Sequence, residues 1–255
     1  MLLAIDIGNT NIILGVFDGD KLKTTLRIAS GIHTMPDEYA ALTLYLLERK
    51  GIAALQITDA VLCSVVPPLV TTFEEVGKQY FDLSPMVVEA GIKTGVRICM
   101  DNPREVGADR IVNAVAAHRL YKGPVIVIDL GTATTFDAVS EDGDYLGGAI
   151  APGIVIATEA LFTRTAALPR VDLTYPKKAI GTSTIAAMQS GIVFGYVGLI
   201  EGIVNRIRQE LGGKAKVVAT GGYSRLFARE TSVIDVVNAD LTLIGLRLIY
   251  QMNTK

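Results

Sequence analysis

Short apolar runs alternate with longer mixed stretches along this chain, and the two kinds of segment predict different secondary structure. The short runs are rich in Val, Ile and Leu and stop at glycine, proline or acidic turns, as buried strands do. They cover residues 2–7, 12–17, 61–66, 125–130, 135–139 and 216–220. The longer stretches predict helices over residues 36–50, 103–121, 153–167, 182–211 and 240–252, with one more that ends at residue 81.

One strand-and-turn pattern occurs twice. Residues 2–11 read Leu-Leu-Ala-Ile-Asp-Ile-Gly-Asn-Thr-Asn, and residues 125–134 read Val-Ile-Val-Ile-Asp-Leu-Gly-Thr-Ala-Thr. Each copy is followed by a second apolar run and then by an acidic glycine turn. Two hairpins of the same design predict a duplicated α/β protein with mixed β-sheets flanked by helices. We expect the first domain to cover residues 1–121 and the second to cover residues 122–255.

Composition narrows the classes of function without selecting one. Of the 255 residues, 50% are hydrophobic and 20% are charged, so a large core can form, and the formal net charge is only −2. A chain without a basic excess is a poor candidate for nucleic-acid binding. The apolar segments 149–157 and 191–200 are shorter than the roughly 20 residues that span a membrane. We therefore expect a soluble protein that binds neither nucleic acid nor a membrane.

The spacing of cysteines and histidines does not predict a metal site. Cys63 and Cys99 each lie in an apolar run, with no second cysteine or histidine at ligand spacing. We expect both to be reduced core residues. His33 and His118 are isolated, and we interpret both as structural.

Asp6 and Asp129 end the two repeated strands, where a carboxylate is costly to bury without a cation or a hydrogen-bond donor. The glycine two residues later permits a tight hairpin whose backbone N–H groups can converge on an anion. The turn residues that add side-chain donors are Asn9, Thr10, Asn11, Thr132, Thr134 and Thr135. Two such loops together could hold a polyphosphate, with the two aspartates positioning cations.

A single Asp-x-Gly is more often a plain hairpin turn, and only its recurrence in matching strand contexts favours a phosphate site. The Gly221-Gly222 turn after strand 216–220 could contact a nucleoside, although the pattern alone favours an ordinary strand-to-helix turn. The sequence lacks the P-loop and the glycine-rich dinucleotide motif. A bound nucleotide would therefore be held by the paired hairpins.

The segment Asp101-Asn102-Pro103-Arg104-Glu105-Val106-Gly107-Ala108-Asp109-Arg110 places five charged residues at the start of an otherwise apolar helix. A solvated helix start with acidic groups near its N-terminus explains most of this pattern. Gly107 and Ala108 point the other way, because small residues beside Asp109 and Arg110 leave space for a ligand.

Four segments resemble the type III pantothenate kinases, a family of actin-like kinases with two duplicated ribonuclease-H-like domains. The segments are residues 6–11, 101–110, 129–134 and 240–246. They occur in the family's order and spacing, so the resemblance spans nearly the whole chain. The Gly107–Arg110 passage is the most specific of them, since other actin-like kinases share both hairpins.

The resemblance implies ATP-dependent phosphorylation of pantothenate to 4′-phosphopantothenate, the first step of coenzyme A synthesis. It also implies that Asp109 accepts the proton of the attacking hydroxyl, that Asp6 lies near the Mg²⁺ of ATP, and that Asp129 binds an activating K⁺ or NH₄⁺. The residues implied to bind ATP are Asp6, Ile7, Gly8, Asn9, Thr10, Asn11 and Thr132. The residues implied to bind pantothenate are Met100, Gly107, Ala108, Asp109, Arg110 and Thr184. The family resemblance further implies a cytoplasmic homodimer.

Met100 departs from the family, whose members usually carry a tyrosine immediately before the Asp-Asn-Pro run. Methionine keeps the bulk but lacks the phenol hydroxyl, so one contact with pantothenate differs while the phosphate chemistry does not.

Two alternatives remain open from the sequence. A kinase for another small acceptor would keep both hairpins without needing the Gly107–Arg110 passage. A catalytically silent, nucleotide-binding regulatory protein would be expected to lose an acidic site residue, whereas Asp6, Asp109 and Asp129 are all present.

Overall fold

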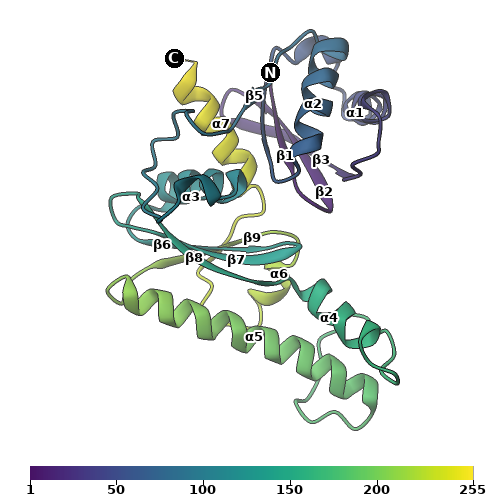
Figure 1. The fold of residues 1–255 in the computed structure, drawn as a ribbon, viewed down its shortest axis with the longest axis vertical. Coiled ribbons are helices and arrows are strands. Elements are labelled where there is room, and N and C mark those ends of the chain that lie inside the picture. Colours follow the sequence, from purple (N-terminus) through teal and green to yellow (C-terminus); the bar gives the residue numbers. More distant parts are fainter. Residues whose placement is uncertain (255) are drawn as a thin grey trace. The chain divides into compact units, whose positions relative to one another are not determined.

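The chain folds into two units with the same strand topology, in a computed structural model that describes residues 1–254 (Figure 1). The first unit comprises Met1–Arg97, Asp101–Ala116 and the residues from Asp240 onward, and the second comprises Ile98–Met100 and Ala117–Ala239. This division differs from the expected boundary between residues 121 and 122, chiefly because the last helix joins the first unit.

The first unit is built on a five-stranded sheet in the order β3-β2-β1-β4-β5. Its strands are β1 (Leu2–Ile7), β2 (Asn11–Asp18), β3 (Lys21–Ala29), β4 (Asp59–Ser64) and β5 (Met86–Val87). Its helices are α1 (Pro36–Arg49), the 3₁₀ turns η1 (Ala54–Gln56) and η2 (Pro103–Glu105), α2 (Pro67–Tyr80), the first part of α3 (Ala108–Tyr121), and α7 (Leu241–Asn253). The hairpins β1–β2 and β2–β3 are antiparallel, whereas β1–β4 and β4–β5 are parallel.

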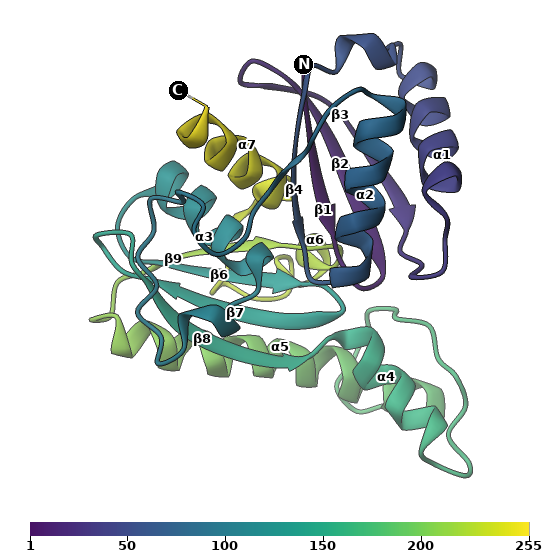
Figure 2. The same cartoon turned by 45° about the horizontal axis from the view of Figure 1, so that its top comes forward.

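Both faces of this sheet are covered by helices. Successive side chains of a strand point to opposite faces, so alternate residues of one strand pack against different helices. In β1, Leu3, Ile5 and Ile7 belong to the cluster that includes α1 and α2. Leu2 and Ala4 belong instead to the cluster that includes α3 and α7. Figure 2 shows α1 and α2 on one side of the strands and α7 on the other. Asp6 follows Leu2 and Ala4 at the same period of two.

The second unit repeats this plan with a sheet in the order β10-β9-β6-β7-β8. Its strands are β6 (Val125–Leu130), β7 (Ala133–Val139), β8 (Tyr145–Pro152), β9 (Lys216–Thr220) and β10 (Val236–Val237). Its helices are α4 (Ile154–Thr163), α5 (Thr184–Glu210) and α6 (Ser224–Phe227). The pairs β6–β7 and β7–β8 are antiparallel, and β6–β9 and β9–β10 are parallel. Each strand of the second sheet thus has a counterpart in the first, which confirms the predicted duplication.

Helix α5 covers one face of the second sheet (Figure 1). Tyr196, Ile200 and Val204 pack there against Ile126, Ile128 and other strand residues. With 27 residues, α5 extends well beyond the apolar segment 191–200 and is long and apolar enough to cross a bilayer by length and composition. The burial of one of its faces on a sheet is what a core helix of a globular unit requires.

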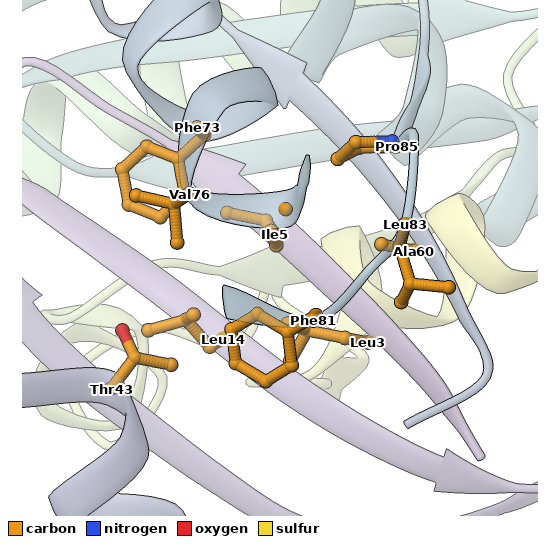
Figure 3. Close-up of a pocket in the computed structure, with 11 residues that line it drawn as sticks. Leu3, Ile5, Leu14, Thr43, Ala60, Phe73, Val76, Phe81, Leu83 and Pro85 are labelled. Carbon is orange, nitrogen blue, oxygen red and sulfur yellow. The ribbon is translucent and has the colours of Figure 1, made fainter. Parts of the chain in front are cut away.

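The core of the first unit contains a small void, about 10 Å³ in volume, between the sheet and α2 (Figure 3). Its lining is apolar except for Thr43, whose buried hydroxyl oxygen has no hydrogen-bond partner among the described residues. A bound water needs two to four polar partners, so the void does not suit one. It is a packing defect of the scaffold and lies apart from the strand ends that carry the hairpin turns.

Candidate active site

The first hairpin turn is held open by its own backbone and by Ser30, the residue that follows β3. Gly8 N–H donates to the Asn11 carbonyl at 3.0 Å, and the Ser30 hydroxyl donates to the Gly8 carbonyl at 2.5 Å. Ser30 N–H also donates to the Thr10 carbonyl at 3.0 Å. These bonds leave the side chains of Asn9, Thr10 and Asn11 exposed, as a phosphate-binding turn requires.

Asp6 lies at the end of β1 beside Cys63 of β4, its lateral partner in the parallel register. The Cys63 thiol donates to the Asp6 Oδ1 atom at 3.5 Å. Burial raises the pKa of Asp6 to about 7, and the negative charge of Asp109 adds to that shift. Burial and the same two carboxylates raise the pKa of the Cys63 thiol well above its usual range, so the thiol stays protonated.

Asp109 reaches the same region from α3. The predicted helix 103–121 is broken into η2 and α3, and the break places Asp109 in the first turn of α3, where Arg110 N–H donates to its Oδ1 atom at 2.8 Å. Gly107 makes room for this carboxylate, because a Cβ atom there would lie 2.5 Å from Asp109 Oδ1. Burial raises the pKa of Asp109, although the Arg110 hydrogen bond and charge lower it in part. A carboxylate with a raised pKa is suited to accept a proton.

The second hairpin is one residue tighter than the first. Three residues separate its last strand pair, Leu130–Thr134, whereas four separate Ile7 from Ile12. Thr132 is exposed at the turn. Gly153 packs directly against this turn, and its N–H donates to the Thr132 carbonyl at 3.2 Å. A Cβ atom on Gly153 would lie only 2.1 Å from that oxygen.

Two threonines expected beside this turn serve the scaffold instead. Thr134 is buried and forms a short hydrogen bond with the Tyr196 hydroxyl, which donates to the Pro152 carbonyl at 3.1 Å. Thr135 donates to the Asp137 carboxylate at 3.0 Å. The expectation that both add donors to the turn is wrong, because β7 begins at Ala133 and draws them into the sheet.

The Gly221-Gly222 turn packs directly against Asp129. Gly221 has a positive φ of +86°, and a Cβ atom there would lie 2.6 Å from Asp129 Oδ1. Only glycine combines this conformation with this closeness. The sequence pattern alone favoured an ordinary turn here. The signal that marks it is that β9, which it follows, lies beside β6, the strand that carries Asp129 near its end.

Met100 and Thr184 lie in the second unit. Met100 is half-buried, and its Cγ atom would lie 3.8 Å from a Cβ atom on Gly147 of β8. Thr184 begins α5, where the preceding Ser183 accepts the capping hydrogen bond from Ala186 N–H. Cys99, next to Met100, is exposed, so the expectation of a core cysteine holds for Cys63 and is wrong for Cys99.

An apolar groove of about 780 Å³ runs between α4 and α5. Its lining includes Leu161 of α4, Leu168 after it, and Met188, Ile192 and Leu199 of α5. Leu161 and, nearby in the same helices, Ile156 and Ile185 expose large apolar side chains. Thr184 lies at one end of this surface.

The chemistry available is therefore that of two partly buried carboxylates beside an open turn. Among residues 1–254, no group of three or more His, Cys, Asp or Glu side chains could hold a metal ion by itself. A cation at this site would take its remaining ligands from a bound phosphate, as Mg²⁺ commonly does. Such a site is suited to phosphoryl transfer.

Comparison with known proteins agrees with this chemistry. Residues 2–206 match the family model described as type III pantothenate kinase. The type III pantothenate kinase of Dehalococcoides mccartyi is 57% identical over 252 residues, which cover 99% of this chain and 96% of that protein.

Solved structures share the fold at much lower identity. A putative Baf family transcriptional activator from Campylobacter jejuni has a TM-score of 0.64 and 19% identity, covering 98% of each chain. A putative 2-dehydro-3-deoxygalactonokinase from Sinorhizobium meliloti has a TM-score of 0.58 and 13% identity, covering 99% of this chain and 96% of that one. With the matching sheets, these likenesses confirm the expected actin-like α/β fold.

Proposed function

This chain belongs to the type III pantothenate kinase family and so transfers a phosphoryl group from ATP to pantothenate, and we propose that Asp109 is the base of that reaction. The product is 4′-phosphopantothenate, and the reaction opens coenzyme A synthesis. The observation that carries the proposal is the meeting of Asp6 and Asp109, from segments about a hundred residues apart, in one partly buried acidic cluster.

In the proposed mechanism, an Asp109 carboxylate oxygen takes the proton of the pantothenate hydroxyl. The freed oxygen forms a bond to the γ-phosphorus of ATP as the bond to the β,γ-bridging oxygen breaks, and ADP leaves. Catalysis of this kind depends mainly on positioning and charge neutralisation. The exposed turn from Gly8 to Asn11 would hold the phosphates through its backbone N–H groups and side chains.

Asp6 fits a role beside magnesium. Its carboxylate has a pKa raised by burial and by Asp109, and no lysine or arginine among the described residues pairs with it. A divalent cation would offset both the cost of burying the Asp6 charge and its repulsion by Asp109. When bound with ATP, Mg²⁺ neutralises the phosphate charge, and Asp6 would hold it together with phosphate oxygens.

Asp129 fits a role in holding the activating monovalent cation, K⁺ or NH₄⁺. Its carboxylate lies at a strand end, and the Gly221 turn brings backbone close to it. Carboxylate and carbonyl oxygens are the ligands that hard cations prefer. Thr132, exposed at the neighbouring turn, would contact an ATP phosphate. The roles of Met100, Gly107, Ala108, Arg110 and Thr184 in binding pantothenate remain predictions.

We further propose that the protein is a cytoplasmic homodimer and that a second copy covers the groove between α4 and α5. Contiguous apolar surface of this kind is rarely left open to water on a stable monomer. Light scattering should then report twice the chain mass of 27.2 kDa. A monomer at micromolar concentration would contradict the proposal.

The alternative of a silent regulatory protein gains no support. The likeness to the Campylobacter jejuni activator is at 19% identity and concerns the fold alone. Asp6, Asp109 and Asp129 are all present, and a silent relative has no reason to keep a partly buried Asp6 whose ionisation is opposed by Asp109.

The direct test is ADP release from MgATP with and without pantothenate, in potassium and in ammonium buffer. We expect release to depend on pantothenate and Asp109→Asn to lower kcat by about 10²–10⁴-fold, the range for loss of a general base. Asp101→Asn is the matched control, because Asp101 is exposed in the same passage, and its activity should stay near wild type. Pantothenate-independent release, or an active Asp109→Asn enzyme, would overturn the assignment.

A further inference from the structure

A buried thiol lies beside the carboxylate proposed to meet magnesium, and the reaction described above does not use it. We propose that Cys63 is a positioning residue whose thiol hydrogen bond holds the Asp6 carboxylate in the orientation that binds MgATP. This inference rests on the proposed role of Asp6.

The register of the first sheet fixes the contact. Asp6 and Cys63 are lateral partners in the parallel pair β1–β4, so their side chains leave the same face of the sheet. Cys63 is fully buried, with an exposed fraction of 0%, in the cluster that includes Val112 and Leu246. Its sulfur lies 3.5 Å from Asp6 Oδ1, which is a normal length for a hydrogen bond that involves sulfur.

The chemistry of the pair gives the bond one direction. A carboxylate only accepts hydrogen bonds, so the thiol S–H is the donor and Asp6 Oδ1 is the acceptor. The thiol occupies Oδ1, and Oδ2 remains for a cation or its water ligands. Apart from this thiol, no side-chain donor to Asp6 is present among residues 1–254. The bond therefore restricts the rotation of the carboxylate as well as stabilising its charge.

The internal duplication provides an independent observation. In the second sheet, the lateral partner of Asp129 is Thr220, at the register position that Cys63 occupies in the first. Thr220 is also buried, with an exposed fraction of 2%. The rest of the central part of both strands consists of Ala, Val and Leu. A residue able to donate a hydrogen bond thus recurs beside each strand-end aspartate, where packing alone would favour an aliphatic one.

The competing explanation is that Cys63 only fills space in the core. Substituting Cys63 by Thr or by Val tests the two explanations, because these side chains have nearly the same shape and differ in that only Thr has a hydroxyl. Cys63→Thr copies the residue of the second sheet and keeps a donor, whereas Cys63→Val removes it. Should the larger side chains prevent folding, Cys63→Ser and Cys63→Ala make the same comparison without added bulk.

The experiment measures MgATP binding by calorimetry without pantothenate, together with KM for MgATP, kcat, and the unfolding midpoint of each ligand-free variant. We expect Cys63→Thr to bind MgATP within about twofold of wild type. Cys63→Val should bind about fivefold to tenfold more weakly, which is the effect of losing one hydrogen bond of ordinary strength, because a thiol is a weak donor. The matched control is Val61→Ala, on the same strand and face but opposite Ala4, which should lower the unfolding midpoint and leave MgATP affinity within about twofold.

Equal MgATP affinity in the Thr and Val variants would overturn the inference, and so would a loss in Val61→Ala as large as that in Cys63→Val. A failure of the proposed function is distinguishable, because it appears as pantothenate-independent ADP release in the wild type. The Thr and Val comparison needs no acceptor and would still decide whether the thiol positions Asp6 for the nucleotide.

Discussion

At the scale of single residues, Gly107 determines where the proposed base can lie. Its backbone has no left-handed φ, so alanine could adopt the same conformation. The obstacle is steric, because the added Cβ atom would lie 2.5 Å from Asp109 Oδ1 and 3.7 Å from Val65. The carboxylate, which is held by Arg110 N–H, would have to move.

We therefore predict that Gly107→Ala lowers kcat by roughly 10–100-fold, since displacing a reacting group by about 1 Å has effects of that size. The unfolding midpoint should change little. The double variant Gly107→Ala with Asp109→Asn provides the check, because a change that acts through the Asp109 carboxylate adds nothing once that carboxylate is gone. Additive losses in kcat would show that Gly107 acts by another route.

At the scale of elements, α3 is held in place by a close approach of α7. Gly245 lies against the backbone of α3, where an added Cβ atom would be 2.2 Å from the Val112 carbonyl oxygen. Beside it, Thr242 donates to the buried Asn113 side chain at 2.8 Å. The first turn of α3 carries Asp109, so the packing of α7 against α3 determines the position of the proposed base relative to Asp6.

Gly245→Ala should accordingly destabilise the protein by about 1–3 kcal/mol, the usual cost of overpacking, even though alanine is the better helix former. It should also lower kcat, because α3 must shift. Gly198→Ala in α5 is the matched control, since no atom lies within 4 Å of the added Cβ and helix propensity alone should make it neutral or stabilising. Equal denaturation midpoints for the two variants would refute the proposed crossing.

The elements that the sequence predicted well are those with a strong local signal. The long helices and the repeated strands lie within a few residues of their predicted bounds, because their apolar periods are strong and glycine or proline ends them. The four edge strands β3, β5, β8 and β10 were not predicted. Of these, β5 and β10 have two residues each, which carry no period. The break before α3 was missed as well, and it is the feature that puts Asp109 in a first helical turn.

The roles of side chains were likewise predictable where the signal was local and unpredictable where it depended on distant residues. The aspartates were predictable from their position at strand ends, whereas the inward turn of Thr134 depends on Tyr196, sixty-two residues away. The contact between Cys63 and Asp6 depends on strand register, which a single sequence does not supply.

At the scale of the whole molecule, the acidic cluster makes stability depend on pH. Burial raises the pKa of Asp6 from its ordinary value of 3.8 to about 7 in the folded protein, so between these two pH values the folded state holds a proton that the unfolded state has lost. Stability from this group is therefore greatest below about pH 4 and falls as pH rises toward 7, by about 1.4 kcal/mol per unit of pKa difference.

We predict that Asp6→Asn abolishes MgATP-dependent turnover yet stabilises the ligand-free protein at pH 8, by on the order of 1–3 kcal/mol. The gain should shrink toward pH 4, and saturating MgATP should reverse the order by stabilising only the wild type. Urea unfolding at several pH values measures both effects. A variant less stable than wild type at pH 8 would contradict an unfavourable, partly desolvated charge at Asp6.

Helix α7 leaves the ribosome after every strand of both sheets has been synthesised, yet it completes the unit formed by the earliest strands. Until it arrives, the face of the first sheet that carries Leu2, Ala4 and Val61 lacks a cover that α7 supplies through Leu243, Leu246 and Ile249. The second unit, by contrast, has all its own elements by Ala239. A nascent chain at that stage presents an apolar sheet face, which is the kind of surface that chaperones bind. Translation that stops before Leu241 therefore yields a product prone to aggregation rather than a shorter kinase.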